Sequence, residues 1–326
     1  MVVPVSLAAD AERLAGQGKV QEALHLLTKG PGAGTPEALF ELGVWSFSGQ
    51  FIGRDLRAAR DLFRQAAEAG HPEAARFHTA LLANGTGGPS DWPNAINLLE
   101  RLATTDVSAK RQLGLVRSMA ITDAGDPVQC ASARMLSEAP YVAHFPGLLS
   151  EAECAYLIEA AEPLLQPAVI VHPVTGQLFR DPIRTSTAAA FPLAFENPAI
   201  HALNRRLAAA TRSDVKQGEP LQILSYAPRQ EYKPHHDAIP GAANQRIATI
   251  LVYLNEGYEG GETHFPSAGL SFKGKVGDAL MFRNTHDDGS TDEQTIHAGR
   301  PVKHGRKLIA SRWIRAEPID PMRPLR

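Results

Sequence analysis

The sequence predicts an α+β protein of two parts, in which an N-terminal helical solenoid precedes a β-rich domain with flanking helices. Two observations support this. Residues in the first ~120 positions recur with a period of thirty-six, and the rest of the chain consists of short strand-like segments between turns. Such a period is typical of stacked helical hairpins. Many short strands without intervening helices favour a sandwich or jelly roll over a parallel sheet.

The repeat is visible in both apolar and turn-forming residues. Within each unit the apolar residues fall at helical spacing, and such a hairpin cannot bury its apolar face alone. The register slips after residue 105, and we expect the repeat domain to span residues 1–122. The recurring sets are Ala23, Ala59 and Ala95; Leu26, Leu62 and Leu98; Leu27, Phe63 and Leu99; Pro36-Glu37-Ala38 and Pro72-Glu73-Ala74; Gly49 and Gly85; and Asp55 and Asp91.

A linker is expected at residues 123–140, which contain Gly125, Pro127 and Pro140 with little periodicity. The second domain should span residues 141–318, with a tail at 319–326. It begins with a predicted helix, for which Ser150 and Glu153 form the signature of a capping box. Strands are predicted at residues 221–226, 247–254, 279–282 and 307–314.

The composition is that of a globular protein, with 44% hydrophobic and 21% charged residues and a net charge of −2. This balance argues against a mainly electrostatic nucleic-acid binder, and no apolar run reaches the length of a membrane span. The start, Met1 to Ser6, lacks the basic region of a secretory signal, so a cytoplasmic location is expected. Cys130 and Cys154 have neither disulfide nor zinc spacing, and we expect both to be small buried apolar side chains.

The triplet His235-His236-Asp237 is the strongest candidate site. On an extended strand residues 235 and 237 share one face, and His297 follows on a distant strand. Two histidines and a carboxylate leave open positions on an octahedral metal, as in non-haem Fe(II) oxygenases. Twelve histidines make a chance triplet an open alternative. A second such pattern, His286-Asp287-Asp288, lies in an expected exposed loop with too little chain after it to return on another strand.

Lys307 lies ten residues after His297, at the start of a predicted strand. Lys307, Ile309, Ser311 and Trp313 should share one strand face. A buried lysine facing a metal cavity would need a carboxylate partner, which a dicarboxylate co-substrate could provide. The alternative is an exposed lysine beside a turn, and that is the more usual environment of this residue type.

From Pro140 to Ile314 the chain resembles the Fe(II)/2-oxoglutarate dioxygenases of the prolyl 4-hydroxylase alpha-subunit type. The similar segments occur in the family's order and are Phe145–Cys154, Arg184–Ser186, Gly218–Tyr226, Glu231–Asp237, Arg246–Pro266 and His297–Lys307. The first part, including Phe40–Gly43 and Asp61–Gly70, resembles tetratricopeptide repeats of the Sel-like subclass. The first resemblance implies a double-stranded β-helix, which is a jelly roll.

The same resemblance implies roles for individual residues. His235, Asp237 and His297 are the implied iron ligands, and Lys307 the implied partner of the distal carboxylate of 2-oxoglutarate. Tyr226 and Thr263 are expected to hydrogen-bond to that co-substrate. The implied peptide groove is lined by Arg184, Ser186, Glu219, Tyr232, Arg246 and Trp313, although packing in the core is an equal alternative for Trp313. Arg315 departs from the family pattern, in which many members have histidine.

The implied activity is hydroxylation of a prolyl residue in a peptide or protein, with succinate and CO2 as co-products. It requires Fe(II), 2-oxoglutarate and dioxygen, and the resemblance adds ascorbate. We expect the repeats to dock the substrate or a partner, with no role for nucleic acid or a membrane. Two alternatives stay open, namely a hydroxylase of a free amino acid or small metabolite and a non-catalytic interaction scaffold.

Overall fold

The computed structural model describes residues 6–129, 131–168, 170–171, 178–179 and 183–320. The chain divides into two compact units, one formed by the residues up to Gly125 with Leu193–Ala202, and one formed by Asp126–Pro192 with Leu203–Ile319. Cys130 and residues 321–326 of the expected tail lie outside the described residues, whereas Cys154 is buried as predicted. In the described part of the chain no helix is both long and apolar enough to cross a membrane.

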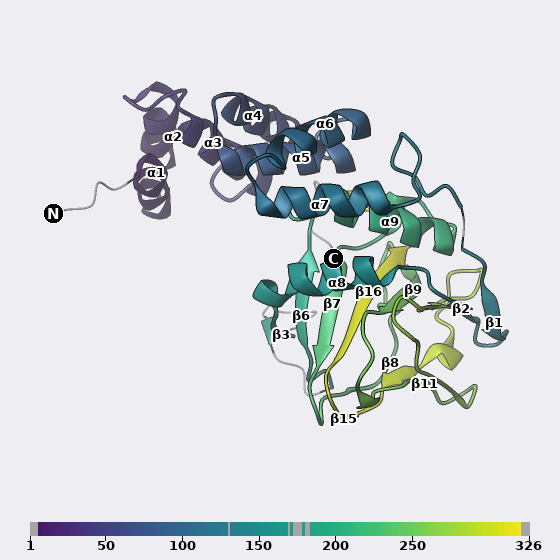
Figure 1. The fold of residues 1–326 in the computed structure, drawn as a ribbon. Helices are drawn as coiled ribbons and strands as arrows, with labels where there is room; N and C mark the ends of the chain where they lie inside the picture. The colour runs from purple at the N-terminus through teal and green to yellow at the C-terminus, as the bar shows by residue number, and fades with distance from the viewer. Residues whose placement is uncertain (1–5, 130, 169, 172–177, 180–182, 321–326) are drawn as a thin grey trace. The chain divides into compact units, whose positions relative to one another are not determined.

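The first unit is helical between residues 7 and 118, a stretch that is described throughout (Figure 1). Its helices are α1 (Leu7–Gly16), α2 (Val20–Lys29), α3 (Pro36–Ser48), α4 (Leu56–Glu68), α5 (Pro72–Asn84), α6 (Trp92–Leu102) and α7 (Val107–Ser118). The first residues of α3 and α5 are thirty-six positions apart, and so are those of α4 and α6. This spacing confirms the predicted repeat of helical hairpins.

The recurring turn residues are the caps of these helices. Asp55 and Asp91 accept hydrogen bonds from backbone N–H groups in the first turns of α4 and α6, which have no partner inside the helix. Gly49 and Gly85 end α3 and α5 in the left-handed conformation, with φ of 72° and 74°. Glycine adopts this conformation without a Cβ clash, so the recurring glycine gives both turns the same backbone conformation.

The recurring apolar residues form the interior of the helical unit. Ala23, Ala59 and Ala95 are fully buried, as are Leu27 and Phe63. The slip in register is also explained. The N-cap of α7 is Asp106, thirty-five positions after His71, the N-cap of α5 (106 − 71 = 35).

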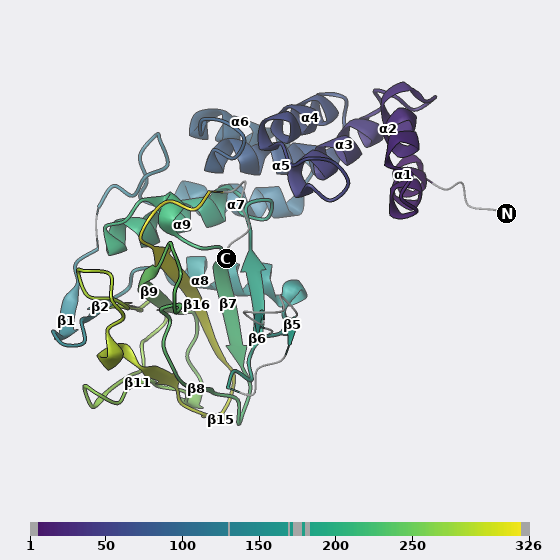
Figure 2. The ribbon, with the colours of Figure 1, turned by 180° about the vertical axis from the view of Figure 1, so that it is seen from behind.

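The second unit is built from strands with two helices (Figures 1 and 2). The helices are α8 (Glu151–Ala161) and the part of α9 (Pro198–Thr211) that follows Ala202, with short 3-10 turns at Glu162–Leu164, Val215–Gln217 and Glu293–Thr295. The strands are β1 (Arg134–Ser137), β2 (Val142–Phe145), β3 (Gln166–Pro167), β4 (Ile170–Val171), β5 (Leu178–Phe179), β6 (Thr187–Phe191), β7 (Leu221–Tyr226), β8 (Tyr232–His235), β9 (Arg246–Tyr253), β10 (Glu259–Gly260), β11 (Thr263–Phe265), β12 (Leu270–Phe272), β13 (Ala279–Arg283), β14 (His297–Gly299), β15 (Val302–His304) and β16 (Lys307–Arg315).

The strands form two main antiparallel sheets. The larger has the order β1-β2-β13-β9-β16-β7-β6-β3, and the smaller has the order β12-β11-β14-β8. One cluster of buried apolar side chains includes Tyr253, Phe282 and Ile309 of the larger sheet together with Phe265 of the smaller one. The order of strands in each sheet departs from their order in the chain, as a jelly roll requires. The fold class predicted from the sequence is therefore confirmed.

The elements predicted for this unit are present with small shifts at their ends. The four predicted strands correspond to β7, β9, β13 and β16. Ser150 and Glu153 make both hydrogen bonds of the capping box at the start of α8. Part of the segment expected to be a linker, Arg134–Ser137, forms β1 and pairs with β2.

Candidate metal centre and co-substrate pocket

His235, Asp237 and His297 lie together in the second unit. One potential ligand atom from each side chain lies within 4.8 Å of the other two. His235 and His297 are opposite partners in the pairing of β8 with β14, and this register places their rings side by side. Asp237 follows in a bend just after β8, so the extended strand predicted for all three triplet residues ends at His235.

Backbone carbonyl groups fix the orientation of both imidazoles. The Nδ1 of His235 lies 2.8 Å from the carbonyl oxygen of Lys233, and the Nδ1 of His297 lies 3.1 Å from that of Thr295. A carbonyl can only accept, so each Nδ1 carries a hydrogen, and Nε2 is the ring atom that each histidine can offer to a metal. The Nε2 atoms lie 3.6 and 3.7 Å from the Asp237 carboxylate. Metal-binding histidines are commonly oriented in this way.

The protonation states also suit a metal cation. Burial lowers the pKa of His297 to about 4, so its imidazole is neutral at pH 7. Burial alone would raise the pKa of Asp237, but the imidazoles of His297 and His235 and the hydroxyl of Thr249 together lower it below its usual range. The site thus offers one carboxylate and two imidazole nitrogens, which is the donor set of the 2-His-1-carboxylate iron sites.

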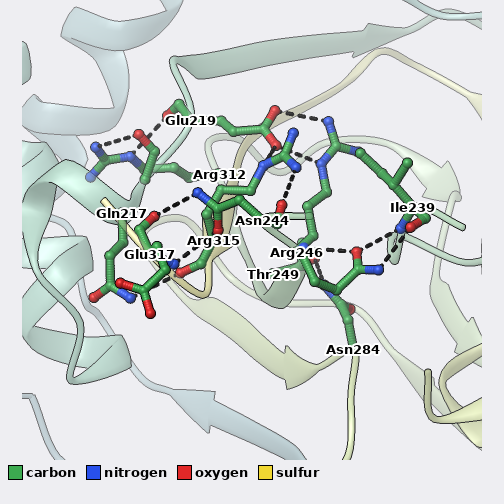
Figure 3. A network of polar contacts seen from close by, with 12 residues as sticks. Gln217, Glu219, Ile239, Asn244, Arg246, Thr249, Asn284, Arg312, Arg315 and Glu317 are labelled. Atoms are coloured by element: carbon green, nitrogen blue, oxygen red, sulfur yellow. Dashed lines mark hydrogen bonds and ion pairs between the residues drawn. The ribbon is translucent and has the colours of Figure 1, made fainter. Parts of the chain in front are cut away.

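Two buried residues that the sequence did not indicate support Asp237. The Thr249 hydroxyl donates a hydrogen bond of 2.7 Å to Oδ2 of Asp237. Nδ2 of Asn284 donates one of 3.0 Å to the Thr249 hydroxyl (Figure 3). Both side chains are fully buried. The sequence did offer one signal, since Thr249 is a polar residue in a predicted strand of apolar ones. It lies two positions before Leu251, so Thr249 and Leu251 share the strand face toward the site.

One cavity of the second unit is lined by the three candidate ligands and by residues predicted to bind the co-substrate and substrate. Its predicted lining residues are Tyr226, Tyr232, His235, Asp237, Thr263, His297, Lys307, Ile309, Ser311 and Trp313. The face of β16 expected to carry Lys307, Ile309, Ser311 and Trp313 is therefore confirmed. Leu224, Leu251 and Gly299 also line this cavity and were not predicted.

Lys307 is a buried residue of this cavity, with 2% of its surface exposed. Its ammonium donates a hydrogen bond of 2.6 Å to the carbonyl of Gly261, and no carboxylate of the described residues lies within ion-pairing distance. Burial lowers its pKa to about 7. Gly261 must remain small, because a Cβ there would lie 3.1 Å from Cδ of Lys307 and its φ is +71°. The exposed alternative for Lys307 is therefore wrong.

The other two predicted co-substrate contacts lie near the lysine. Tyr226 is the direct partner of Lys307 in the pairing of β7 with β16, and Nζ of Lys307 lies 5.6 Å from the centre of its ring. The Thr263 hydroxyl lies 2.7 Å from the hydroxyl of Tyr253. Burial raises the pKa of Tyr226, so the phenol keeps its hydrogen.

The residues predicted to line a peptide groove fall into two groups. Near the ligands, the Tyr232 ring stacks on His235 with centroids 3.4 Å apart, and the Arg184 guanidinium lies over Tyr232 at 5.5 Å. Nε of Arg184 also donates a hydrogen bond of 3.3 Å to Ser186. Tyr232 lines the cavity, whereas Arg184 and Ser186 are buried behind it.

The second group surrounds the buried carboxylate of Glu219. Oε1 of Glu219 accepts hydrogen bonds of 2.6 Å from both Arg246 and Arg315, and Oε2 accepts one of 2.8 Å from Arg246 (Figure 3). The Arg246 guanidinium lies 3.9 Å from the centre of the Trp313 ring. Arg315, which departs from the family pattern, is therefore held inside the protein by this carboxylate, and of the group only Trp313 lines the cavity.

The residues present fit an iron ion and a dicarboxylate. Two imidazoles and one carboxylate lie close enough together to share one ion, and the buried amino group of Lys307 has a backbone carbonyl but no carboxylate as its hydrogen-bond partner in the described part of the chain. The competing pattern at 286–288 does not assemble a comparable cluster among the described residues. His286 is exposed, and the side chain of Asp287 is 97% exposed.

Comparison with known proteins agrees with this geometry. The family model of the 2OG-Fe(II) oxygenase superfamily matches residues 221–315, which contain all three ligands and Lys307. Prolyl 4-hydroxylase 1 of Arabidopsis thaliana is 36% identical over 200 residues, which cover 56% of this chain and 71% of that protein.

Two solved structures resemble different parts of the chain. The viral collagen prolyl hydroxylase of Paramecium Bursaria Chlorella virus-1, solved as a 2OG complex, is 30% identical, with a TM-score of 0.44 over 56% of this chain and 99% of that one. A Sel1 repeat protein from Oxalobacter formigenes is 26% identical, with a TM-score of 0.30 over 33% of this chain and 85% of that one. The extent of the match to the plant relative, with the match to the oxygenase model, shows that this chain belongs to the prolyl 4-hydroxylase family of Fe(II)- and 2-oxoglutarate-dependent oxygenases.

Proposed function

We propose that this chain hydroxylates a prolyl residue in a peptide or protein, with 2-oxoglutarate and dioxygen as co-substrates and succinate and CO2 as co-products. The observation that carries the proposal is a single cavity lined by a 2-His-1-carboxylate cluster and by a buried lysine. The similarity to prolyl 4-hydroxylases supplies the substrate class.

In this proposal His235, Asp237 and His297 hold Fe(II). When bound, the iron and 2-oxoglutarate supply the oxidising chemistry, in which the co-substrate is decarboxylated and one oxygen atom enters a C–H bond. The chain contributes position and shielding. The hydrogen bonds from Thr249 to Asp237 and from both Nδ1 atoms to the backbone keep the donor atoms aimed at one point before the metal arrives.

Lys307 is proposed to pair the distal carboxylate of 2-oxoglutarate. A buried ammonium without an acidic partner is costly, and a bound carboxylate would offset that cost. The Tyr226 phenol would donate a second hydrogen bond. Thr263 is proposed to hydrogen-bond to the same carboxylate; its hydroxyl lies 2.7 Å from that of Tyr253, which also donates to the carbonyl of Phe272.

The peptide is proposed to approach the cavity along Tyr232 and Trp313. The indole N–H of Trp313 is buried and has no acceptor among the described residues, so a peptide carbonyl would satisfy it. Arg184, Ser186, Glu219 and Arg246 are proposed to act by holding these two rings in place. We also propose that the helical repeats dock the substrate and that ascorbate sustains turnover.

The proposal is tested by measuring succinate formed by the full-length protein with Fe(II), 2-oxoglutarate and ascorbate. A proline-rich peptide should stimulate succinate formation, and free proline should not. A matched peptide with alanine in place of proline is the control for binding without hydroxylation. Equal stimulation by free proline, or by the alanine peptide, would contradict a peptidyl-proline hydroxylase.

A further inference from the structure

The helical unit has a hollow of about 520 Å³ that plays no part in the chemistry described above. Arg57, Arg60 and Arg64 line it from α4, where the spacing of three and then four residues places them on one helix face. Arg101 lines it from α6, and His78 lines it from α5. The hollow thus gathers four guanidinium groups, whereas the net charge of the whole chain is −2.

The charges of this hollow are only partly compensated. Arg64 pairs with Asp61 at 2.8 Å and with Glu68 at 2.7 Å, and Nη1 of Arg60 donates a hydrogen bond to the carbonyl of Pro89. By contrast, Arg57 and Arg101 are exposed, and their guanidinium groups make no hydrogen bond or ion pair within the described part of the chain. Two guanidinium groups are therefore available to a ligand.

His78 provides an independent sign of a ligand. Its side chain lines the hollow and is only 9% exposed, yet its Nδ1 has no hydrogen-bond partner in the described part of the chain. A buried polar atom left without a partner costs about 1–3 kcal/mol. Burial, with the nearby charges of Arg60 and Arg64, lowers the pKa of His78 to about 4, so the ring is neutral at pH 7. This nitrogen is itself covered, so a ligand in the hollow would meet it, and remove the cost, after the ring turns toward the hollow.

We propose that this hollow binds an acidic segment of a protein partner, through carboxylate groups paired with Arg57 and Arg101. Guanidinium groups bind carboxylates with two parallel hydrogen bonds, and stacked helical repeats present surfaces suited to extended segments. The proposal rests on the docking role proposed above for the repeats and adds the chemistry of what they dock. Arg60, whose guanidinium donates to a backbone carbonyl, adds positive charge to the hollow, whereas Arg64 is already paired with Asp61 and Glu68.

The test uses full-length protein without iron or 2-oxoglutarate and a fluorescein-labelled Glu-Ser repeat peptide. Fluorescence polarisation should show binding that weakens with added salt, and a Gln-Ser peptide of the same length should bind far less. The double variant Arg57→Ala/Arg101→Ala should lose about tenfold or more in affinity. The control Lys29→Ala/Lys110→Ala removes the same charge from exposed residues outside the hollow and should bind normally.

Three results would overturn the proposal: equal binding of the Glu-Ser and Gln-Ser peptides, unchanged affinity of the arginine variant, or tighter binding of a single-stranded RNA than of the acidic peptide. Succinate formation without a peptide substrate, measured on the same samples, separates this proposal from the catalytic one. The arginine variant should keep that activity. Loss of succinate formation by the wild-type protein would count against the hydroxylase and leave the peptide-binding result standing.

Discussion

Thr249 offers a sharp test of how the site holds its metal. The change Thr249→Val keeps the volume of the side chain but removes the hydroxyl that donates a hydrogen bond of 2.7 Å to Oδ2 of Asp237. It also removes the acceptor for Nδ2 of Asn284. Thr249 is fully buried, so water cannot replace either hydrogen bond.

The expected loss follows from the charge of the acceptor. A hydrogen bond to an ionised group contributes about 1.5–3 kcal/mol, which corresponds to a factor of about 10–150 in an equilibrium constant. Changes in residues that support metal ligands typically lower metal affinity by about 10- to 100-fold. We therefore expect Thr249→Val to bind the metal about 10- to 100-fold more weakly.

Titration calorimetry with Mn(II) or Co(II) in the presence of 2-oxoglutarate measures this affinity without oxidation of the metal. Thr249→Ser keeps the hydroxyl and should retain most of the affinity. Circular dichroism should show that both variants are folded. If Thr249→Val binds the metal as tightly as the wild-type protein, the hydrogen bond to Asp237 does not position the ligand and the reasoning fails.

The remaining predictions concern the lysine and the start of α8. Lys307→Met should raise the KM for 2-oxoglutarate by about 10- to 150-fold, because it removes a charge-assisted bond, whereas the exposed control Lys303→Met should not. In the protein without 2-oxoglutarate, burial lowers the pKa of Lys307 to about 7, and only the ammonium form makes an ion pair with a carboxylate. The affinity for 2-oxoglutarate should therefore fall as pH rises above about 7, by at most about tenfold per pH unit, and an affinity that rises with pH would contradict this role. Ser150→Ala should lower the free energy of unfolding by about 1 kcal/mol in urea denaturation, because it removes the side-chain cap of α8.

Much of this architecture follows from local patterns that the sequence displays. The thirty-six-residue period predicted the helical hairpins because the recurring residues are their caps and buried positions. The alternation along residues 307–313 placed Lys307 and Trp313 on one face because a strand has a period of two. The cytoplasmic location and the domain boundaries stay predictions.

The features that local patterns did not indicate depend on contacts between distant strands. The resemblance predicted that His297 joins His235, but the pairing of β8 with β14 that brings them together is not specified by either segment alone. The support of Asp237 by Thr249 and Asn284 joins residues of three segments. The burial of Arg315 against Glu219 likewise depends on contacts across ninety-six positions of the chain.

The most direct test of the proposed function is mass spectrometry of a proline-rich peptide after reaction under labelled dioxygen. The wild-type protein with Fe(II) and 2-oxoglutarate should place one labelled oxygen atom on a prolyl residue and form succinate with it. Asp237→Ala, which removes the carboxylate ligand, should do neither. Full activity of Asp237→Ala, or an oxygen atom found only on residues other than proline, would contradict the account.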